Sequence, residues 1–343
     1  MMAQPAMLVQ ISMGGVLFLN EKSIGILGQY DIEVKKTTRA RGGFVCDTSR
    51  GLILFKEYDV KERHLKFEKE IMLKLKESGI RADYFLEFDS ENVIAEGDDG
   101  KKYVIKEWYP SRECNIKDRN DIIKSAGMLG KIHTILQEKR GDECTELYPC
   151  DLRNEFVRHT IEIKRARNYI RRKNNKNPFE NELLRSIDKF YQKAEEASAK
   201  ILECDYESMR KYAYDNQTVC HGAFNHHNII FVGKDAVAVD YKNAVIDVQV
   251  TDLYDFLRKV MEKYNWDMQL GNNIIESYDR EKTIGIQDRK LLKVMLQYPE
   301  KFWKVTNKYY NGNKAWIADK NMEKLKMVKE QWEVKQKFVD TIL

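Results

Sequence analysis

Residues 219–240 read VCHGAFNHHNIIFVGKDAVAVD, and this stretch decides the fold. A polar loop ending at Asn228 precedes a short apolar strand at 229–232, and a Gly-Lys-Asp turn leads into a second strand at 237–239. A hairpin of this kind brings Asn228 close to Asp240, which ends the second strand. Amide and carboxylate oxygens are the hard ligands that hold magnesium over the phosphates of ATP. The stretch therefore predicts a site for magnesium and nucleotide.

The three histidines of this loop, His221, His226 and His227, offer a second interpretation, because imidazoles also bind zinc. The sequence around them lacks the spaced pattern of carboxylates and histidines that zinc enzymes use. A structural hydrogen bond made by His221 is therefore the favoured interpretation.

The composition is that of a globular protein with a mixed surface. Its 343 residues exceed one average domain, and 43% hydrophobic residues suffice for a buried core. The 59 basic and 54 acidic residues leave a net charge of +5, which demands neither nucleic acid nor a membrane as a partner. Six scattered cysteines without a CxxC pair favour a reducing cytosol. The apolar stretch at 6–19 is too short to span a bilayer and lacks the basic start of a signal peptide.

The chain before residue 110 has the pattern of a small antiparallel sheet with one main helix. We predict strands at 32–34, 44–46, 52–55, 92–95 and 103–108, a helix at 61–78, and a tight turn at 97–100. Beyond Pro110 the periodicity becomes helical, first at 122–136 and then through a long charged segment at 154–202. The basic cluster at 164–176 is interpreted as a solvated helix face rather than as an anion-binding surface.

The order of features from His221 to Asp252 resembles the catalytic loop of the aminoglycoside phosphotransferase and choline kinase superfamily. In that family a histidine-glycine-aspartate triplet is followed five residues later by a metal-binding asparagine, and Asn228 lies five residues after Ala223. The resemblance implies that Asp240 is the carboxylate that holds magnesium. It also implies a catalytic aspartate where this chain has Ala223, whose methyl group can neither accept a proton nor bind a metal.

The same resemblance gives expectations for residues outside the loop. It implies that Asp252 hydrogen-bonds the backbone of the loop, although a plain helix-start acid is an equal alternative. Lys56, at the end of an apolar strand, takes the position of the lysine that contacts nucleotide phosphates. Glu68 is its expected partner because it lies on the apolar face of the helix, whereas Glu70 points to solvent; plain surface charge remains the alternative. Strand 103–108 would offer backbone groups to adenine if a nucleotide binds between the lobes.

Three separated segments carry a closer resemblance. These are WYPSREC at 108–114, CHG with NHHN at 220–228, and YPEKFW with NKYYN at 298–311. In this order they are similar to the CotS-type spore-coat protein family of endospore-forming bacteria. The resemblance implies an α+β, bilobed, protein-kinase-like fold, with a small antiparallel-sheet N-lobe and a larger, mainly helical C-lobe. It also implies synthesis in the cytoplasm, incorporation into the spore coat, and other coat proteins as partners.

We therefore expect an N-terminal extension at 1–27, an N-lobe at 28–110, and a C-lobe at 111–343 that holds the catalytic-loop-like segment 219–243. One functional hypothesis is a kinase-like coat protein that is catalytically impaired by Ala223 and still binds ATP with magnesium. The other is an active ATP-dependent phosphotransferase for a small-molecule hydroxyl or amine, in which another acid replaces the missing aspartate. Asp215 and Asp247 are candidates for that acid, and their spacing selects neither.

Overall fold

The computed structural model describes residues 21–40, 42–88, 92–97, 100–137, 147–312 and 319–342. The chain forms two compact units, Met1–Arg112 and Glu113–Leu343, called unit 1 and unit 2 below. The predicted apolar stretch at 6–19 and the centre of the predicted turn at 97–100 lie outside the described residues.

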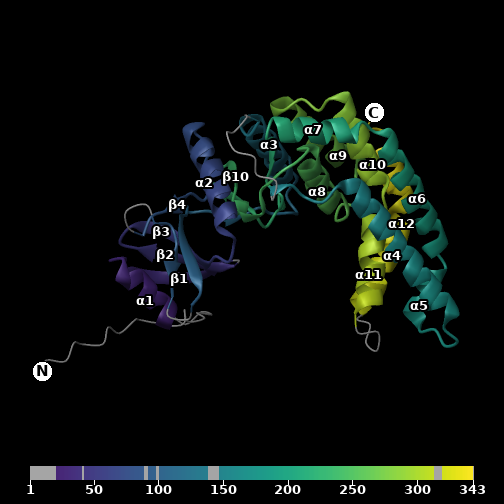
Figure 1. Cartoon of the computed structure of the whole chain (residues 1–343), viewed down its shortest axis with the longest axis horizontal. Coiled ribbons are helices and arrows are strands. Elements are labelled where there is room, and N and C mark those ends of the chain that lie inside the picture. The colour runs from purple at the N-terminus through teal and green to yellow at the C-terminus, as the bar shows by residue number, and fades with distance from the viewer. Residues whose placement is uncertain are drawn as a thin grey trace, which may run out of the picture. The chain divides into compact units, whose positions relative to one another are not determined.

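Unit 1 is built on an antiparallel sheet whose strands follow the order β1-β2-β3-β6-β4, with β5 also paired to β6. Its elements are α1 (Glu21–Gln29), β1 (Val34–Ala40), β2 (Gly43–Thr48), β3 (Gly51–Glu57), α2 (Glu62–Glu77), β4 (Phe85–Leu86), β5 (Ala95–Glu96) and β6 (Lys102–Glu107). The predicted sheet with one main helix is therefore present, and Figure 1 shows α2 beside these strands.

The alternation of side chains along β3 and β6 gives the sheet two buried faces. Phe55 and Ile105 lie on one face and join a core cluster that includes Leu27 of α1. Val104 lies on the other face and packs with Leu65 of α2. The sequence assigned residues up to 27 to an extension, whereas Leu27 is fully buried in the core of unit 1. A nine-residue helix was not foreseen there because its segment is short and interrupted by glycines.

Unit 2 consists mainly of helices around a few short strands. It contains β7 (Arg112–Glu113, at the junction), α3 (Arg119–Ile135), α4 (Leu152–Arg172), α5 (Pro178–Leu184), α6 (Ile187–Glu203), α7 (Tyr206–Asp215), β8 (Val219–Cys220), β9 (Ile229–Val232), β10 (Asp235–Ala238), the short 3₁₀ helix η2 (Tyr241–Asn243), β11 (Val245–Ile246), α8 (Val250–Met261), α9 (Met268–Glu281), α10 (Ile286–Gln297), α11 (Glu300–Asn311) and α12 (Asp319–Val339). In the described ranges no helix is both long and apolar enough to cross a bilayer.

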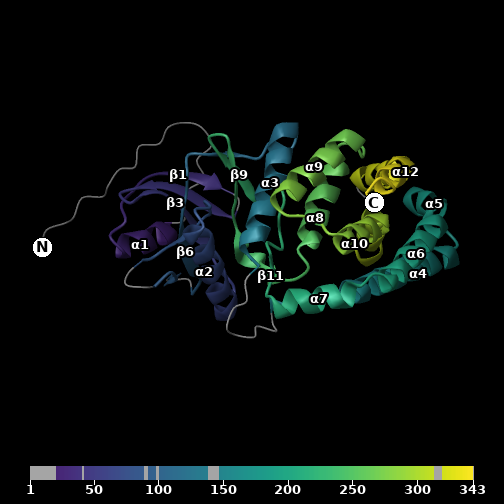
Figure 2. The same cartoon turned by 90° about the horizontal axis from the view of Figure 1, so that it is seen from above.

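The charged segment at 154–202 folds as three helices because each has one apolar stripe. Helices α4 and α6 run side by side in Figures 1 and 2, and α3 packs along α9. Arg167 and Arg171 of the basic cluster both reach Asp188 of α6, at 3.3 and 2.6 Å. These ion pairs agree with the interpretation of the cluster as a helix face.

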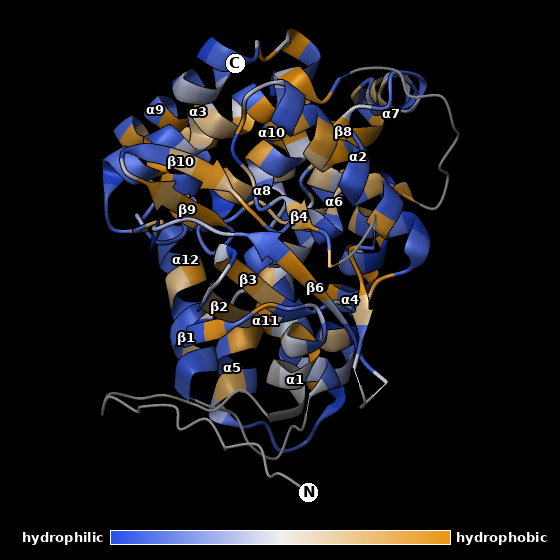
Figure 3. Cartoon of the chain, turned by 90° about the vertical axis from the view of Figure 1, so that its left-hand side faces the viewer, coloured by the Kyte–Doolittle hydropathy of each residue, from blue (hydrophilic) through white to orange (hydrophobic). Residues whose placement is uncertain are grey.

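Two short strand pairs position the loop between His221 and Asn228. Strands β9 and β10 form a hairpin in which Ile229 faces Ala238, and Figure 3 shows both strands as largely hydrophobic. Gly233 has a φ of +63°, which suits the two-residue turn of this hairpin. Strand β8 pairs with β11. The loop therefore begins after the β8–β11 pair and ends at the β9–β10 pair, so both of its ends are held by backbone hydrogen bonds.

Candidate active site

The loop His221–Asn228 is fastened at its start by a single carboxylate. Asp252, in the first turn of α8, accepts hydrogen bonds from the backbone N–H groups of His221 and Gly222, the latter at 3.1 Å. Its side chain is almost fully buried. Carboxylates that accept backbone N–H bonds form strong, charge-assisted contacts. Asp252 therefore accepts the expected hydrogen bonds from the loop backbone. It also lies in the first turn of a helix, as the second interpretation proposed.

Asp252 is in turn held by a buried chain of polar groups. His133 Nε2 of α3 lies 3.2 Å from Asp252 Oδ2, and His133 Nδ1 lies 2.7 Å from the Tyr278 hydroxyl of α9. Burial lowers the pKa of His133, which favours a neutral ring that donates from Nε2 and accepts from Tyr278. Burial alone would raise the pKa of Asp252, but the hydrogen bonds that it accepts from His133 and from the backbone N–H of His221 lower it and keep the carboxylate ionised.

The side chain of His221 also has a structural role in the loop. Its Nε2 lies 3.1 Å from the backbone oxygen of Val239, and its Nδ1 accepts the backbone N–H of Ala223 at 3.3 Å. Both ring nitrogens are thus engaged within the fold. Among the described residues, no group of three or more histidine, cysteine or carboxylate side chains is placed to hold a metal ion. Hydrogen bonds thus account for both ring nitrogens of His221.

Gly222 is required by the backbone geometry of the loop. Its φ is +71°, and a Cβ added there would lie 2.0 Å from the backbone oxygen of Asn243. Any side chain would therefore both strain the backbone and collide with η2. The close approach brings the loop against the segment that begins at Asp240.

Asn228 and Asp240 are brought together by the β9–β10 hairpin. The backbone N–H of Val239 donates to the backbone oxygen of Asn228 at 2.9 Å, so Asp240 follows directly after the partner of Asn228. The amide nitrogen of Asn228 donates to the backbone oxygen of Ala223 at 3.0 Å, which leaves Oδ1 as the acceptor of this side chain. Asp240 has a φ of +66°, an uncommon conformation that is typical of functional sites. One amide oxygen and one carboxylate fit the oxygen preference of magnesium, which usually takes only one or two protein ligands beside phosphates.

A cavity of about 440 Å³ adjoins the start of the loop within unit 2. Gly222, Asp252 and Asp247 contribute to its lining, together with side chains of α4, α8 and α11. Oδ1 of Asp247 is buried and has no hydrogen-bond partner among the described residues. Burial raises the pKa of Asp247 to about 7. A buried carboxyl group with one unpaired oxygen, beside a loop of this kind, marks a candidate acceptor cavity.

The structure separates the two candidate substitutes for the missing acid. Asp215, at the end of α7, is exposed and forms an ion pair with Lys211 at 2.8 Å, and it is absent from the lining of the cavity. Asp247 lines the cavity and lies opposite Thr218 of the neighbouring backbone segment. Thr218 precedes Cys220 by two residues, whereas Ala223 follows Cys220 by three, so Asp247 lies on the side of β8 away from Ala223. A general base must reach its proton within hydrogen-bonding distance. Asp247 is therefore the better of the two candidates, although it is set back from the position of the missing carboxylate.

In unit 1, Glu68 lies in a buried charged cluster. Lys106 Nζ lies 2.5 Å from Glu68 Oε1 and 3.0 Å from Asp83 Oδ2, and the Tyr58 hydroxyl also donates to Glu68. Burial lowers the pKa of Lys106, but the two carboxylates outweigh it and raise that pKa above its usual value. Sequence reasoning placed Lys56 beside Glu68 and missed Lys106. Lys56 is buried in β3, on the same face of the sheet as Lys106. Burial raises the pKa of Asp83, and the charges of Lys106 and Lys56 act against that rise.

A family model described as "Spore coat putative kinase YutH" matches residues 25–342, nearly the whole chain. The chain belongs to this spore-coat kinase family. A search of curated proteins gave no match. The expected membership of a spore-coat family with a kinase-like fold is thus confirmed.

Solved structures similar to this spore-coat kinase-family protein support the fold. An aminoglycoside phosphotransferase from Alicyclobacillus acidocaldarius superposes with a TM-score of 0.84 at 18% identity, covering 96% of this chain and 97% of that one. Spectinomycin phosphotransferase APH(9)-Ia in its AMP-bound complex gives 0.63 at 11% identity, covering 94% and 98%. Its complex with ADP and spectinomycin gives 0.64 at 12% identity, covering 92% and 98%. The predicted α+β, protein-kinase-like fold is therefore confirmed.

Proposed function

We propose that this spore-coat kinase-family protein binds ATP with magnesium and that its phosphoryl transfer is impaired by Ala223. The observation that supports the proposal most strongly is the pairing of Asn228 with Asp240 beside a loop that carries Ala223 where a carboxylate is expected. Magnesium bound to these two side chains would neutralise charge on the nucleotide phosphates. The chain itself would supply the positioning of that metal through the hairpin and the Asp252 anchor.

The alanine affects one contribution to catalysis and spares the others. A general base is worth about 10²–10⁴-fold in rate, whereas positioning and electrostatic stabilisation supply most of phosphoryl transfer. Asn228, Asp240 and Asp252 remain, so the side chains that would bind the metal and the loop geometry are retained while the proton acceptor is lost. A nucleotide-binding protein with weak turnover is the expected outcome.

The proposal is tested by titrating the protein with ATP in the presence of magnesium and measuring its thermal stability. A ligand that binds only the native state raises stability by RT ln(1 + L/Kd), where L is the free ligand concentration, so the increase grows with the logarithm of that concentration above Kd. We expect a clear increase for the natural chain and little increase for Asp240→Asn, which loses the metal-binding charge. Asp235→Asn is the matched control, because Asp235 is exposed on the same hairpin and lies outside the site. The absence of any shift at millimolar nucleotide would remove the nucleotide-binding proposal.

The cavity beside Gly222 supports a second candidate function, an active phosphotransferase for a small-molecule hydroxyl or amine. In this case Asp247 would take part in binding the acceptor or in moving its proton. The variant Asp247→Asn separates the two candidates, because it should reduce turnover of an active enzyme and leave nucleotide binding of an impaired one intact. Replacement of Asp215 by Asn serves as the comparison.

We further propose that the protein is made in the cytoplasm and assembles with other proteins into the spore coat. The family description and the separate sequence segments that resemble coat proteins support this location. Fractionation of spores and of vegetative cells by immunoblotting tests it. Recovery in the coat fraction is expected, and recovery only from vegetative cytosol would contradict the proposal.

A further inference from the structure

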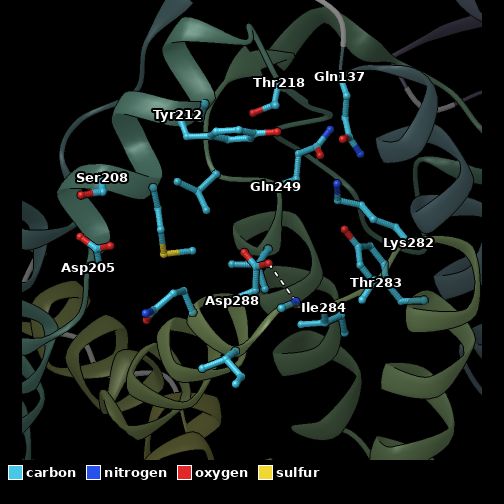
Figure 4. A pocket seen from close by; sticks show the side chains of 18 residues that line it. Gln137, Asp205, Ser208, Tyr212, Thr218, Gln249, Lys282, Thr283, Ile284 and Asp288 are labelled. Carbon is cyan, nitrogen blue, oxygen red and sulfur yellow. Dashed lines mark hydrogen bonds between the residues drawn. The ribbon is translucent and has the colours of Figure 1, made fainter.

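Unit 2 contains a second cavity, of about 510 Å³, distinct from the one beside Gly222. Its walls come from α7, from the start of α8, and from the segment joining α9 to α10 (Figure 4). A volume of this size is typical of sites for small organic ligands. Tyr212 and Ile286, which line this cavity, are 61% and 69% exposed, so apolar surface continues outward from it.

The lining is mostly apolar with one cationic group. The apolar residues are Met209, Ala213, Val248, Val250, Ile284 and Ile286. Lys282 extends from the end of α9 into the cavity, and Figure 4 shows its amine directed toward Gln249. Among the residues that the structure describes, Lys282 Nζ makes no hydrogen bond or ion pair. Burial lowers the pKa of this half-buried lysine, so an anion placed beside it would restore a favourable environment for its charge.

The acidic side chains of the lining are placed differently. Asp288 accepts the backbone N–H of Gly285 at 3.2 Å and thereby caps α10, and its charge offsets only part of the effect that burial has on the pKa of Lys282. Asp205 lies across the cavity from Lys282 in Figure 4. A single ammonium of this kind suits a monoanion, because a dianionic phosphate would leave one charge without a partner in apolar surroundings.

We propose that this cavity binds a small amphipathic monocarboxylate, with its carboxylate at Lys282 and its apolar body against α7 and α8, and that binding steadies the loop His221–Asn228. The cavity wall reaches the loop by two routes. Gln249 donates to the backbone oxygen of Val219 at 2.9 Å, two residues before the loop begins. Tyr278 lines the cavity and is the first member of the buried chain that runs through His133 to Asp252. Neither route requires a bound nucleotide, so the inference stands apart from the proposed function.

Calorimetric titration with octanoate, octanol and octylammonium tests the recognition, because the three probes share one apolar body. Octanoate is expected to bind roughly tenfold more tightly than octanol, as for a hydrogen bond to a charged group. Lys282→Met should remove that difference, whereas Lys290→Met, on the exposed side of α10, should retain it. Ile286→Glu should weaken octanoate more than octanol, because the added charge repels only the carboxylate, and its exposed position leaves folding unaffected. Equal affinities for octanoate and octanol, or a preference for octylammonium, would overturn the proposal.

Amide hydrogen exchange of the peptide that contains His221 and Gly222 tests the effect on the loop. Saturating octanoate is expected to slow exchange of these two amides several-fold, because both donate to Asp252. Tyr278→Phe, which breaks the chain at its hydroxyl, should reduce that protection at saturating octanoate. Unchanged exchange in the natural chain with octanoate bound would refute the second half of the proposal and leave the first half standing.

Discussion

Replacing Lys106 by methionine should strongly destabilise unit 1. The lysine side chain is fully buried and lies 2.5 Å from Glu68 and 3.0 Å from Asp83, so its removal breaks two buried ion pairs. Breaking a buried ion pair by removing one partner costs about 3–5 kcal/mol. Methionine fills most of the volume of the lysine side chain, so the loss of stability reports on the missing charge rather than on a new cavity. We expect a decrease of this size in the free energy of unfolding.

The pH dependence of the same variant gives a second readout. Burial already raises the pKa of Asp83 and the charge of Lys106 opposes that effect, so this pKa rises further in the folded state when the ammonium is removed. A carboxyl group with a raised folded pKa stabilises the protein at low pH and loses that contribution as pH rises. The deficit of Lys106→Met should therefore be smaller near about pH 5 than near about pH 8.

Hydrogen exchange along a urea series measures the effect, because peptides from β3 and β6 report on unit 1 alone. Lys102→Met is the matched control, since Lys102 is exposed on the same strand. A deficit below about 1 kcal/mol, the range of an exposed ion pair, would refute the account of the cluster, as would a deficit that is independent of pH.

Three further changes test the site in unit 2. Asp247→Asn should flatten the pH dependence of stability. Burial raises the pKa of Asp247 to about 7, so the natural chain loses stability as pH rises toward that value. Denaturant titrations that give the same pH profile for both proteins would contradict this. Gly222→Ala should destabilise the protein by more than the about 1–2 kcal/mol of backbone strain, because the added Cβ would collide with Asn243. Gly233→Ala is the control and should cost only the strain, because its Cβ would lie in open space. Equal losses of stability in thermal melts would contradict the close approach of Gly222 to Asn243. Asp252→Ala should cost about 3 kcal/mol or more and speed amide exchange in the loop, since it leaves buried donors without an acceptor; an unaltered loop would refute its anchoring role.

Much of the site was predictable because it is local in the sequence. Asn228 and Asp240 flank one short hairpin, and a two-residue turn with Gly233 fixes their separation. The helix-start position of Asp252 likewise follows from its place at the beginning of an apolar periodic segment. Local patterns of this kind give the order of elements and the faces on which their side chains lie.

The groups that support the site were not predictable because their contacts are distant in sequence. His133 and Tyr278 meet through the packing of α3 on α9, across 145 positions, and neither has a motif of its own. Lys106 was read only as part of a strand, because a lysine in a strand gives no signal that distinguishes a buried ion pair from surface charge. Leu27 was assigned to an extension for a similar reason, since only the packed sheet reveals what α1 buries.

The central claim is tested most directly by ATP turnover in the natural chain and in Ala223→Asp, measured with magnesium at equal concentrations of folded protein. Ala223→Asn is the control, because it matches aspartate in size without accepting a proton. The account predicts little turnover in the natural chain and in the asparagine variant, and an increase in the aspartate variant of up to about 10²–10⁴-fold. Equal and substantial turnover in all three proteins would contradict the claim that Ala223 impairs catalysis.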